Sequence, residues 1–316
     1  MTAENKTKRS LKDWIIATRP WSFPASFISI LVTMAYLYYY YKTYPIEMEI
    51  VAPTGIKWLN GWLSLLMIIL FHAAGNLISD YFDHIKGVDK PGSLNGVTHI
   101  QSGKFTPKGV LWYGIVFLIL ACIMGAIILS LSSWNLFFIA IAAILLTVCY
   151  PWLKAHALGD LNILLCFALI PSLGVNLVVT GSWYLAKEVM LLSLTYGLII
   201  VAILHSNNTR DIESDKEAGL TTLAGILGKR VCQYIYCAEL IIPYLLVLTY
   251  ISMGWISWVT IFVLVTLPLA YKNISIMMKQ SPEYEKEKAI LDKSTAQFEL
   301  VFGVLLAILL VVGIWC

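Results

Sequence analysis

The sequence predicts an all-α protein that crosses a membrane many times. Hydrophobic residues make up 59% of its 316 residues, charged residues only 13%, and the mean hydropathy is +0.77. Soluble domains carry about 25% charged residues, so this composition excludes an ordinary water-soluble domain. Nine apolar segments, each long enough for a membrane-spanning helix, account for most of the chain.

Each of these segments predicts one transmembrane helix, and polar residues separate successive segments. They lie near residues 22–41, 59–77, 110–131, 134–153, 161–181, 188–205, 233–252, 255–271 and 299–316. The first apolar stretch follows a polar, basic N-terminus and is too long for the core of a signal peptide. We therefore expect it to be retained as the first span.

The distribution of basic residues predicts a cytoplasmic N-terminus and a C-terminus outside the cell. With this orientation, all 22 Lys and Arg residues except Lys42, Lys57 and Lys187 fall on the cytoplasmic side. Missing one span midway would destroy this asymmetry. The net charge is only +3 and topology explains the basic residues, so nucleic-acid binding is not indicated. We expect a multi-pass protein in the lipid bilayer of the cell (cytoplasmic) membrane.

A stripe of polar residues follows the sixth segment. Asn207, Asp211 and Asp215 recur every four residues, so they fall within about 80° of one another on a helix. Carboxylates about 4 Å apart repel by about 4 kcal/mol at an effective dielectric near 20, so the stripe requires a cation. Carboxylate and amide oxygens suit Mg²⁺, which completes its coordination shell with substrate phosphate.

A second polar stripe follows the second segment. Asn76, Ser79, Asp80 and Asp83 share a helical face of about 100°, and Asp89 follows in the adjoining polar stretch. A charge at the bilayer midplane costs about 2.5 to 3.5 kcal/mol, so these acids belong near helix ends or in a wet cavity. The predicted topology places both stripes on the cytoplasmic side.

Three basic residues lie close to the stripes in sequence or in predicted topology. Lys154 is the only basic residue of a short cytoplasmic loop and is a candidate phosphate partner, with topology signalling as the alternative. Arg210 is expected either to contact the diphosphate or to form a salt bridge with Asp211 or Glu213. Arg19 suits either an interfacial anchor or a source of positive potential for an anion site.

The remaining polar residues in apolar segments carry no predicted chemistry. The six cysteines form no C-x-x-C pair and are expected to be small core residues. His72 and Glu239 are expected to form hydrogen bonds inside the helix bundle. No His–acid pair is evident near the two stripes.

The two stripes on a nine-span background resemble the UbiA superfamily of intramembrane prenyltransferases. The segment NNTRDIESD (207–215), with RPWSFPAS (19–26) and Lys154…Gly159-Asp160, is most similar to the MenA branch. That branch makes menaquinone and includes vertebrate vitamin K₂ relatives. The similarity spans nearly the whole chain.

This resemblance implies one domain, residues 1–316, with helices around a central cavity. It also implies two magnesium ions that hold a polyprenyl diphosphate between the motifs. Carried over by position, the family's second-motif and diphosphate residues correspond to Asn207, Asn208, Arg210, Asp211, Asp215 and Lys154.

The first motif aligns with the family pattern in two ways. Aligning on Asn76 selects Asp80, whereas aligning on Gly87-x-Asp89 selects Asp83 and Asp89 and places Ser79 where the family has Asn. The candidate metal ligands are therefore Asp80, Asp83, Asp89, Asp211 and Asp215. The Gly-Gly pair usual before the Lys154 region is replaced by Tyr150-Pro151-Trp152, which puts the acceptor pocket in question.

The residues themselves suggest the chemistry. Mg²⁺ and cationic side chains stabilise a departing diphosphate, and an electron-rich aromatic ring attacks the allylic carbocation. A membrane cavity dissolves the prenyl tail and excludes water. The expected catalytic acids are Asp80, Asp83, Asp211 and Asp215, with Asn76, Ser79, Asn207, Asn208, Lys154 and Arg210 at the diphosphate.

The expected acceptor is 1,4-dihydroxy-2-naphthoate, which gives demethylmenaquinone and CO₂. A UbiA-type enzyme with another acceptor, such as 4-hydroxybenzoate, is the first alternative. A cation-coupled transporter is the alternative from another class, because its intramembrane acids would also bind ions. Both stripes lie on one side of the predicted membrane, which favours a one-sided catalytic site.

Overall fold

The computed structural model describes residues 9–52, 54–85, 99–132, 134–217, 219–279 and 290–316. Every secondary-structure element in this part of the chain is helical, apart from an isolated bridge between His156 and Thr221. The predicted all-α class is confirmed for these residues. The chain forms two compact units, unit 1 (Met1–Phe23 with Leu63–Ile127) and unit 2 (Pro24–Trp62 with Ile128–Cys316).

Seven helices in the described residues are long and apolar enough to cross a membrane, so this is a multi-pass membrane protein. They cover Trp58–Phe82, Pro107–Leu131, Gly159–Thr180, Ala186–Arg210, Lys229–Ser252, Trp258–Met278 and Leu291–Trp315. The other two predicted spans correspond to α2 (Pro24–Thr43), rich in Tyr, and α6 (Asn135–Ala155), whose apolar part Asn135–Tyr150 is short. The count of nine spans and the sides of the termini stay predictions.

Two helices extend well beyond the predicted apolar segments. Helix α4 (Trp58–Ile85) runs beyond the predicted segment 59–77 and includes the first polar stripe. Helix α15 (Leu291–Val312) begins before the predicted segment 299–316. Hydropathy detects the part of a helix that suits lipid, whereas polar residues extend the same helix beyond it.

Unit 1 contains α1 (Leu11–Ala17), η1 (Pro20–Ser22), most of α4 and most of α5 (Pro107–Leu131). Helix α1 begins with a capping box, in which the Asp13 N–H donates to Ser10 Oγ (3.2 Å) and the Ser10 N–H to Asp13 Oδ2 (3.0 Å). The Trp14 ring packs edge-on against Phe105 and Tyr113, with centroids 4.7 and 4.8 Å apart. These contacts hold α1 against the turn that precedes α5.

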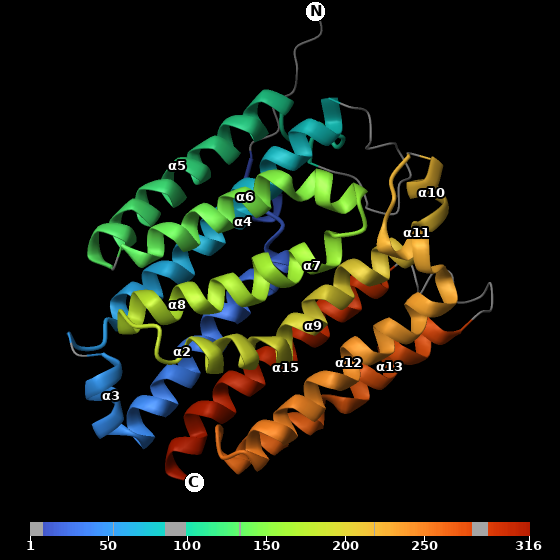
Figure 1. The fold of residues 1–316 in the computed structure, drawn as a ribbon. Helices are drawn as coiled ribbons and strands as arrows, with labels where there is room; N and C mark the ends of the chain where they lie inside the picture. Colours follow the sequence, from blue (N-terminus) through green and yellow to red (C-terminus); the bar gives the residue numbers. More distant parts are fainter. Residues whose placement is uncertain (1–8, 53, 86–98, 133, 218, 280–289) are drawn as a thin grey trace, which may run out of the picture. The chain divides into compact units, whose positions relative to one another are not determined.

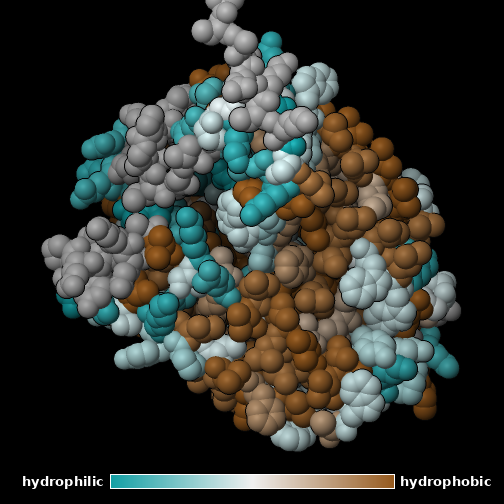
Figure 2. Space-filling view, turned by 180° about the vertical axis from the view of Figure 1, so that it is seen from behind, coloured by the Kyte–Doolittle hydropathy of each residue, from teal (hydrophilic) through white to brown (hydrophobic). Residues whose placement is uncertain are grey.

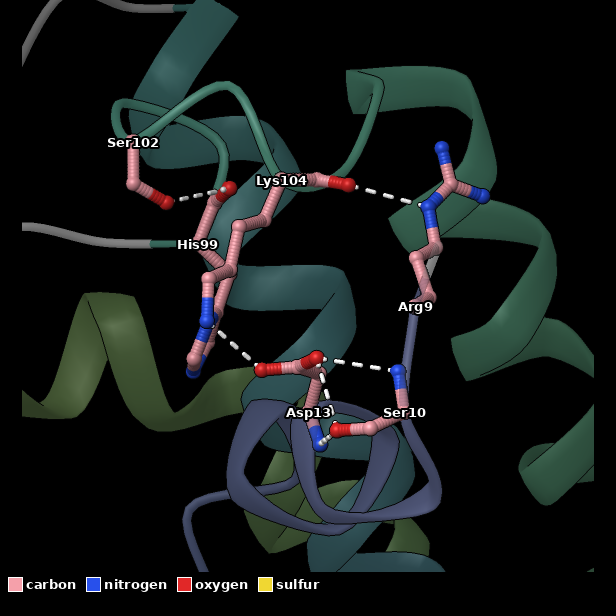
Figure 3. Close-up of polar contacts among 6 residues, drawn as sticks. All are labelled: Arg9, Ser10, Asp13, His99, Ser102 and Lys104. Carbon is pink, nitrogen blue, oxygen red and sulfur yellow. Dashed lines mark hydrogen bonds and ion pairs between the residues drawn. The ribbon is translucent and has the colours of Figure 1, made fainter. Parts of the chain in front are cut away.

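Polar contacts fasten the same junction (Figure 3). Arg9 Nε donates to the Lys104 carbonyl oxygen (2.9 Å), and Lys104 Nζ donates to Asp13 Oδ1 (2.6 Å). The Lys104 ammonium and the Ser10 donors hold the pKa of the Asp13 carboxyl well below its usual value. Helix α1, which leads to Arg19, is therefore anchored to the turn that precedes α5.

Unit 2 is built around α9 (Ala186–Arg210), which packs against α2, α12 (Lys229–Ser252) and α15 (Figure 1). Helix α9 also packs against three consecutive elements, α7 (Gly159–Leu164), η2 (Leu165–Leu169) and α8 (Ile170–Thr180). A Cβ at Gly197 would lie 2.6 Å from Ala168 Cβ, so only glycine allows this close approach of α9 and η2. The remaining elements are α3 (Pro45–Val51), α10 (Ile212–Glu217), α11 (Leu223–Leu227), η3 (Trp258–Thr266), α13 (Leu267–Met278) and η5 (Gly313–Trp315).

Large hydrophobic side chains also lie on the outside of the helices. Hydrophobic residues gather on the face shown in Figure 2. On α6, for example, Phe138 is 68% exposed and Val148 is 72% exposed. Apolar surface on this scale fits contact with lipid tails rather than with water.

Candidate active site

The three polar side chains of the second motif follow one another along the end of α9, as their spacing predicts. The helix ends at Arg210, but the Asp211 N–H donates to the Asn207 carbonyl oxygen (2.9 Å). The Asp215 N–H then donates to the Asp211 carbonyl oxygen (2.8 Å). The i, i+4 backbone hydrogen bonds therefore continue from α9 into α10, although Asp211, with φ −96° and ψ 13°, leaves helical geometry between the two helices.

Two oxygens of this motif are buried without a hydrogen-bond partner in the described part of the chain, Asn207 Oδ1 and Asp215 Oδ2. A buried polar atom without a partner is unfavourable by about 1 to 3 kcal/mol, so the site favours a ligand that supplies one. Oxygen donors of this kind fit Mg²⁺, which commonly takes one or two protein carboxylates. Within the described ranges, no cluster of three or more His, Cys, Asp or Glu has metal-binding geometry.

The electrostatics of Asp215 also favour a cation. Burial raises the pKa of Asp215, and the neighbouring Asp211 raises it further, while Lys154 lowers it. A raised pKa shows that the ionised carboxylate is not fully stabilised by nearby positive charge or hydrogen-bond donors. A divalent cation at the motif would supply that compensation.

Arg210 is engaged with its sequence neighbour. Its Nε and one terminal nitrogen donate to the two carboxylate oxygens of Asp211, each at 2.8 Å. The predicted alternative of a salt bridge to Asp211 is therefore present, and the diphosphate role of Arg210 stays a prediction. Asn208 is buried and its Nδ2 donates to Asp160 Oδ1 at 3.4 Å.

The turn between α6 and α7 brings Lys154 towards the second motif. The Leu158 N–H returns to the Leu153 carbonyl oxygen (2.9 Å), and Ala157 takes a left-handed φ of 61°. His156 then forms the bridge with Thr221, which lies beyond α10. This connection explains the electrostatic influence of Lys154 on Asp215.

Sequence analysis missed a buried histidine beside this motif. His205 Nδ1 lies 3.2 Å from Glu239 Oε1 and 3.8 Å from Asp160 Oδ2. The expectation that no His–acid pair lies near the stripes is therefore wrong. The three residues come from α9, α12 and α7, so no local spacing connects them. The available signal was that each is an ionisable residue in an apolar helix.

The first motif lies on α4 in unit 1, and the N-terminal segment engages its polar groups. Asp80 is buried and forms an ion pair with Arg19, whose own side chain is 37% exposed. Asn76 Nδ2 donates to the Thr18 carbonyl oxygen and to Ser22 Oγ, each at 2.9 Å. Sequence analysis did not identify the Arg19–Asp80 pair, because the two residues lie on separate segments.

Arg19 reaches Asp80 from an unusual backbone conformation. Its φ is 54° and its ψ is 57°, the left-handed region that non-glycine residues seldom adopt. Such strain persists only where surrounding contacts enforce it, and it is often found at functional sites. The other first-motif candidates add less: Ser79 is exposed on α4, the side chain of Asp83 is not described, and Asp89 lies outside the described residues.

Comparison with known proteins places this geometry in context. Residues 43–298 match the UbiA prenyltransferase family. UbiA prenyltransferase domain-containing protein 1 of Danio rerio is 32% identical over 82% of this chain and 73% of its own length. The protein of that name in Homo sapiens is 28% identical over 95% of this chain and 85% of its own length. The expected placement in the MenA branch stays a prediction.

Solved structures share the fold at lower identity. A digeranylgeranylglyceryl phosphate synthase superposes with a TM-score of 0.53 and 18% identity, covering 94% of this chain and 98% of its own. A UbiA homologue from Archaeoglobus fulgidus bound to Cd²⁺ gives a TM-score of 0.51 and 15% identity, covering 92% and 99%.

Proposed function

Because the chain belongs to the UbiA prenyltransferase family and is a prenyltransferase of that type, we propose that it transfers a polyprenyl group to 1,4-dihydroxy-2-naphthoate. The donor is a polyprenyl diphosphate, and the products are demethylmenaquinol (the reduced form of demethylmenaquinone), CO₂ and diphosphate. The observation that supports a metal-bound diphosphate most directly is the pair of buried oxygens without hydrogen-bond partners on Asn207 and Asp215, because such oxygens suit a cation. The proposal places the protein in menaquinone biosynthesis, in the manner of the MenA branch.

The second motif supplies the residues for the metal and the diphosphate. Asp211 and Asp215 would hold Mg²⁺, with Asn207, Asn208, Lys154 and Arg210 oriented towards the diphosphate oxygens. Bound Mg²⁺ neutralises charge on the departing diphosphate. The first motif supplies its own set: Asp80 with Asn76 in one alignment, or Asp83 and Asp89 with Ser79 in the other.

The transfer requires little proton chemistry from the protein. The C–O bond to diphosphate breaks, and the electron pair leaves with the diphosphate. The ring carbon that bears the carboxylate then forms a C–C bond with the allylic cation. Loss of CO₂ returns an electron pair to the ring and restores its aromaticity. Apolar helices around the prenyl tail exclude the water that would trap the cation.

The choice of acceptor rests on sequence similarity to the naphthoate branch. The segments RPWSFPAS and NNTRDIESD match that branch, and His84 interrupts the N-x-x-x-D-x-x-x-D spacing typical of hydroxybenzoate enzymes in the first motif. The segment Tyr150-Pro151-Trp152 favours the second candidate, another aromatic acceptor such as 4-hydroxybenzoate, because it replaces the family's Gly-Gly. Membership in a transferase family removes the motivation for the transporter alternative.

An isotopic experiment tests the acceptor. Purified protein with Mg²⁺, a prenyl diphosphate and carboxyl-labelled naphthoate should release labelled CO₂ in step with prenylated product. The matched reaction uses carboxyl-labelled 4-hydroxybenzoate, for which we expect no product. Prenylated hydroxybenzoate that keeps its label, with naphthoate unreacted, would reassign the acceptor.

We also propose that the protein resides in the cytoplasmic membrane with both motifs on the cytoplasmic side. The scarcity of Lys and Arg in the predicted outer loops, where only Lys42, Lys57 and Lys187 lie, supports this orientation. Reporter fusions after Lys108, Ser182, Glu217 and Cys316 should report inside, outside, inside and outside. An inside signal at Cys316 would remove one span from the predicted topology.

A further inference from the structure

We propose that Asp160, His205 and Glu239 form a positioning cluster that fixes the rotation of α9 and thereby aims the second motif. This inference rests on the proposed function, because it assigns the cluster a role in diphosphate binding. The three side chains belong to α7, α9 and α12, which all lie within unit 2. The transfer chemistry described above uses none of them.

The cluster is buried and held by mutual contacts. Exposure is 1% for His205, 7% for Glu239 and 9% for Asp160. His205 Nδ1 lies between the two acids, 3.2 Å from Glu239 Oε1 and 3.8 Å from Asp160 Oδ2. Ionisable groups inside a membrane bundle pair with one another and are retained mainly where they serve function. The cluster therefore requires an explanation beyond general packing.

Asp160 connects the cluster directly to the motif segment. Its Oδ1 accepts from Asn208 Nδ2 (3.4 Å), while its Oδ2 faces His205. At about 100° per residue, Asn208 lies about 60° and His205 about 120° around the helix from the middle of the face that carries Asn207, Asp211 and Asp215. Asp160 thus contacts α9 at the edge of the motif face.

The rotation of α9 depends on polar contacts between helices as well as on van der Waals packing. Lipid tails are as apolar as the helix surfaces, so no hydrophobic driving force between helices adds to these contacts. Side-chain atoms lie about 5 Å from the helix axis, so a rotation of about 20° would displace them by nearly 2 Å. A misplacement of about 1 Å can reduce rate by about 100-fold, so the contacts of Asp160 and Glu239 with α9 matter for the motif.

The test measures ligand binding separately from turnover. The probe is the thiolo analogue of geranyl diphosphate, which keeps the diphosphate and resists cleavage, titrated in the presence of Mn²⁺. Asp160→Ala should weaken analogue binding by about 10- to 100-fold, as loss of residues that orient metal ligands commonly does. Asp160→Asn keeps an acceptor for Asn208 and should recover part of that loss. Glu239→Gln should weaken binding less than Asp160→Ala.

Glu299→Gln provides the matched control. Glu299 is another fully buried acid of unit 2, on α15, and both of its carboxylate oxygens lack hydrogen-bond partners among the described residues. We expect this change to alter thermal stability and to leave analogue affinity unchanged. In turnover, the Asp160 variants should raise KM for the prenyl diphosphate more than KM for the aromatic acceptor, which a general loss of folded protein would not do.

The outcomes separate this proposal from the proposed function. If the wild-type protein binds the analogue and the folded Asp160 and Glu239 variants bind it equally well, the cluster does not position the motif. Should Asp160→Ala fail to fold, Asp160→Asn and Glu239→Gln keep the side-chain volume and decide the question. If the wild-type protein does not bind the analogue with Mn²⁺, the proposed function fails and the positioning role fails with it.

Discussion

The two polar motifs differ in how the folded chain satisfies them. In unit 1, Asp80 is paired with Arg19, and the Asn76 amide donates to Thr18 and Ser22. In unit 2, Asn207 Oδ1 and Asp215 Oδ2 are buried without hydrogen-bond partners in the described residues. The first motif is thus engaged by an N-terminal segment distant in sequence, whereas two oxygens of the second motif lack hydrogen-bond partners among the described residues.

Because of this difference, binding a cation requires different changes in the two motifs. In the second motif, a cation can bind Asp215 Oδ2 without breaking a hydrogen bond, although Asp211 is shared with Arg210. In the first motif, a metal at Asp80 must replace or join the Arg19 guanidinium. Either Arg19 exchanges on binding, or the ligands are the other aspartates of that motif.

The largest expected effect on turnover comes from substitution of Asp215 in the second motif. Asp215→Ala should lower turnover by on the order of 1,000-fold, because it removes a group that stabilises charge in the transition state. The folded protein should remain in the membrane, since no hydrogen bond to Asp215 Oδ2 is lost. Activity assays and thermal denaturation measure the two quantities.

Glu213→Ala is the control for that change, because Glu213 is an exposed acid on the same short helix. It should retain wild-type turnover. Metal-independent activity in Asp215→Ala, or equal losses in the two variants, would contradict a metal site at the second motif and remove the contrast with the first.

The second largest effect is expected at the first motif, where Arg19 pairs with Asp80. Arg19→Gln should destabilise the protein by about 1 to 3 kcal/mol, because it leaves the buried Asp80 carboxylate without its cation. Asp80→Ala should also lower stability, and the activities of Asp83→Ala and Asp89→Ala depend on which alignment of the first motif is correct. Denaturation midpoints and Mg²⁺ titrations of activity distinguish these cases.

The same series decides between the two alignments of the first motif. Loss of turnover in Asp80→Ala, with Asp89→Ala active, selects the alignment on Asn76. The reverse result selects Asp83 and Asp89 and leaves Asp80 as a partner of Arg19. Full activity of all three variants without added Mg²⁺ would overturn the metal–diphosphate proposal.

Sequence alone predicted the features that depend on local periodicity. The i, i+4 repeat of Asn207, Asp211 and Asp215 appears in the structure as two successive backbone hydrogen bonds of 2.9 and 2.8 Å. Hydropathy located the apolar part of the seven membrane-length helices among the described residues, because lipid imposes a minimum length on apolar segments. It underestimated α4, whose polar end lies outside any hydropathy window.

The contacts that the sequence did not predict join distant segments. Arg19 and Asp80 meet only because α1 is anchored by Trp14 and Lys104, and because Arg19 takes a left-handed conformation. His205 meets its acids from two other helices, so its partners depend on how the helices pack. Periodicity within one helix carries no information about such pairings.

A smaller effect concerns Lys154, the cation that acts on the second motif from a separate turn. Lys154→Met should raise KM for the prenyl diphosphate by about 10- to 100-fold, since hydrogen bonds to charged groups contribute about 1.5 to 3 kcal/mol. Lys216→Met is the control, because Lys216 is exposed and adjacent to Asp215 in sequence. Steady-state kinetics with varied diphosphate measures the difference.

The pH dependence of the same variant has a defined sign. Burial and Asp211 raise the pKa of Asp215, and Lys154 opposes that shift. Metal binding requires the ionised acid, so kcat/KM, which reports the free enzyme, should fall as pH drops through the raised pKa. Removing Lys154 removes the opposing influence and should move the acid limb of the profile to higher pH. A shift to lower pH would contradict this account of the second motif.

The smallest effect compares two ion pairs within unit 1. Lys104→Gln removes the partner of Asp13, an acid whose pKa lies below its usual value because of that hydrogen bond and those from Ser10. A lowered pKa contributes stability above the unfolded value, near 3.8, and the contribution is lost as pH falls through the folded value. Lys104→Gln should therefore lower the denaturation midpoint slightly at neutral pH and not in strong acid.

Arg19→Gln provides the reference, because it is the equivalent loss of a cation opposite a buried acid. Exposed pairs contribute little, since water screens the charges and ordering the side chains costs entropy. The midpoint should therefore fall further for Arg19→Gln than for Lys104→Gln, and only Arg19→Gln should alter the Mg²⁺ dependence of turnover. Equal losses in stability would show that burial of Asp80 is not what distinguishes the first motif, and that the N-terminal segment is held as firmly by its surface contacts as by its pairing with the motif.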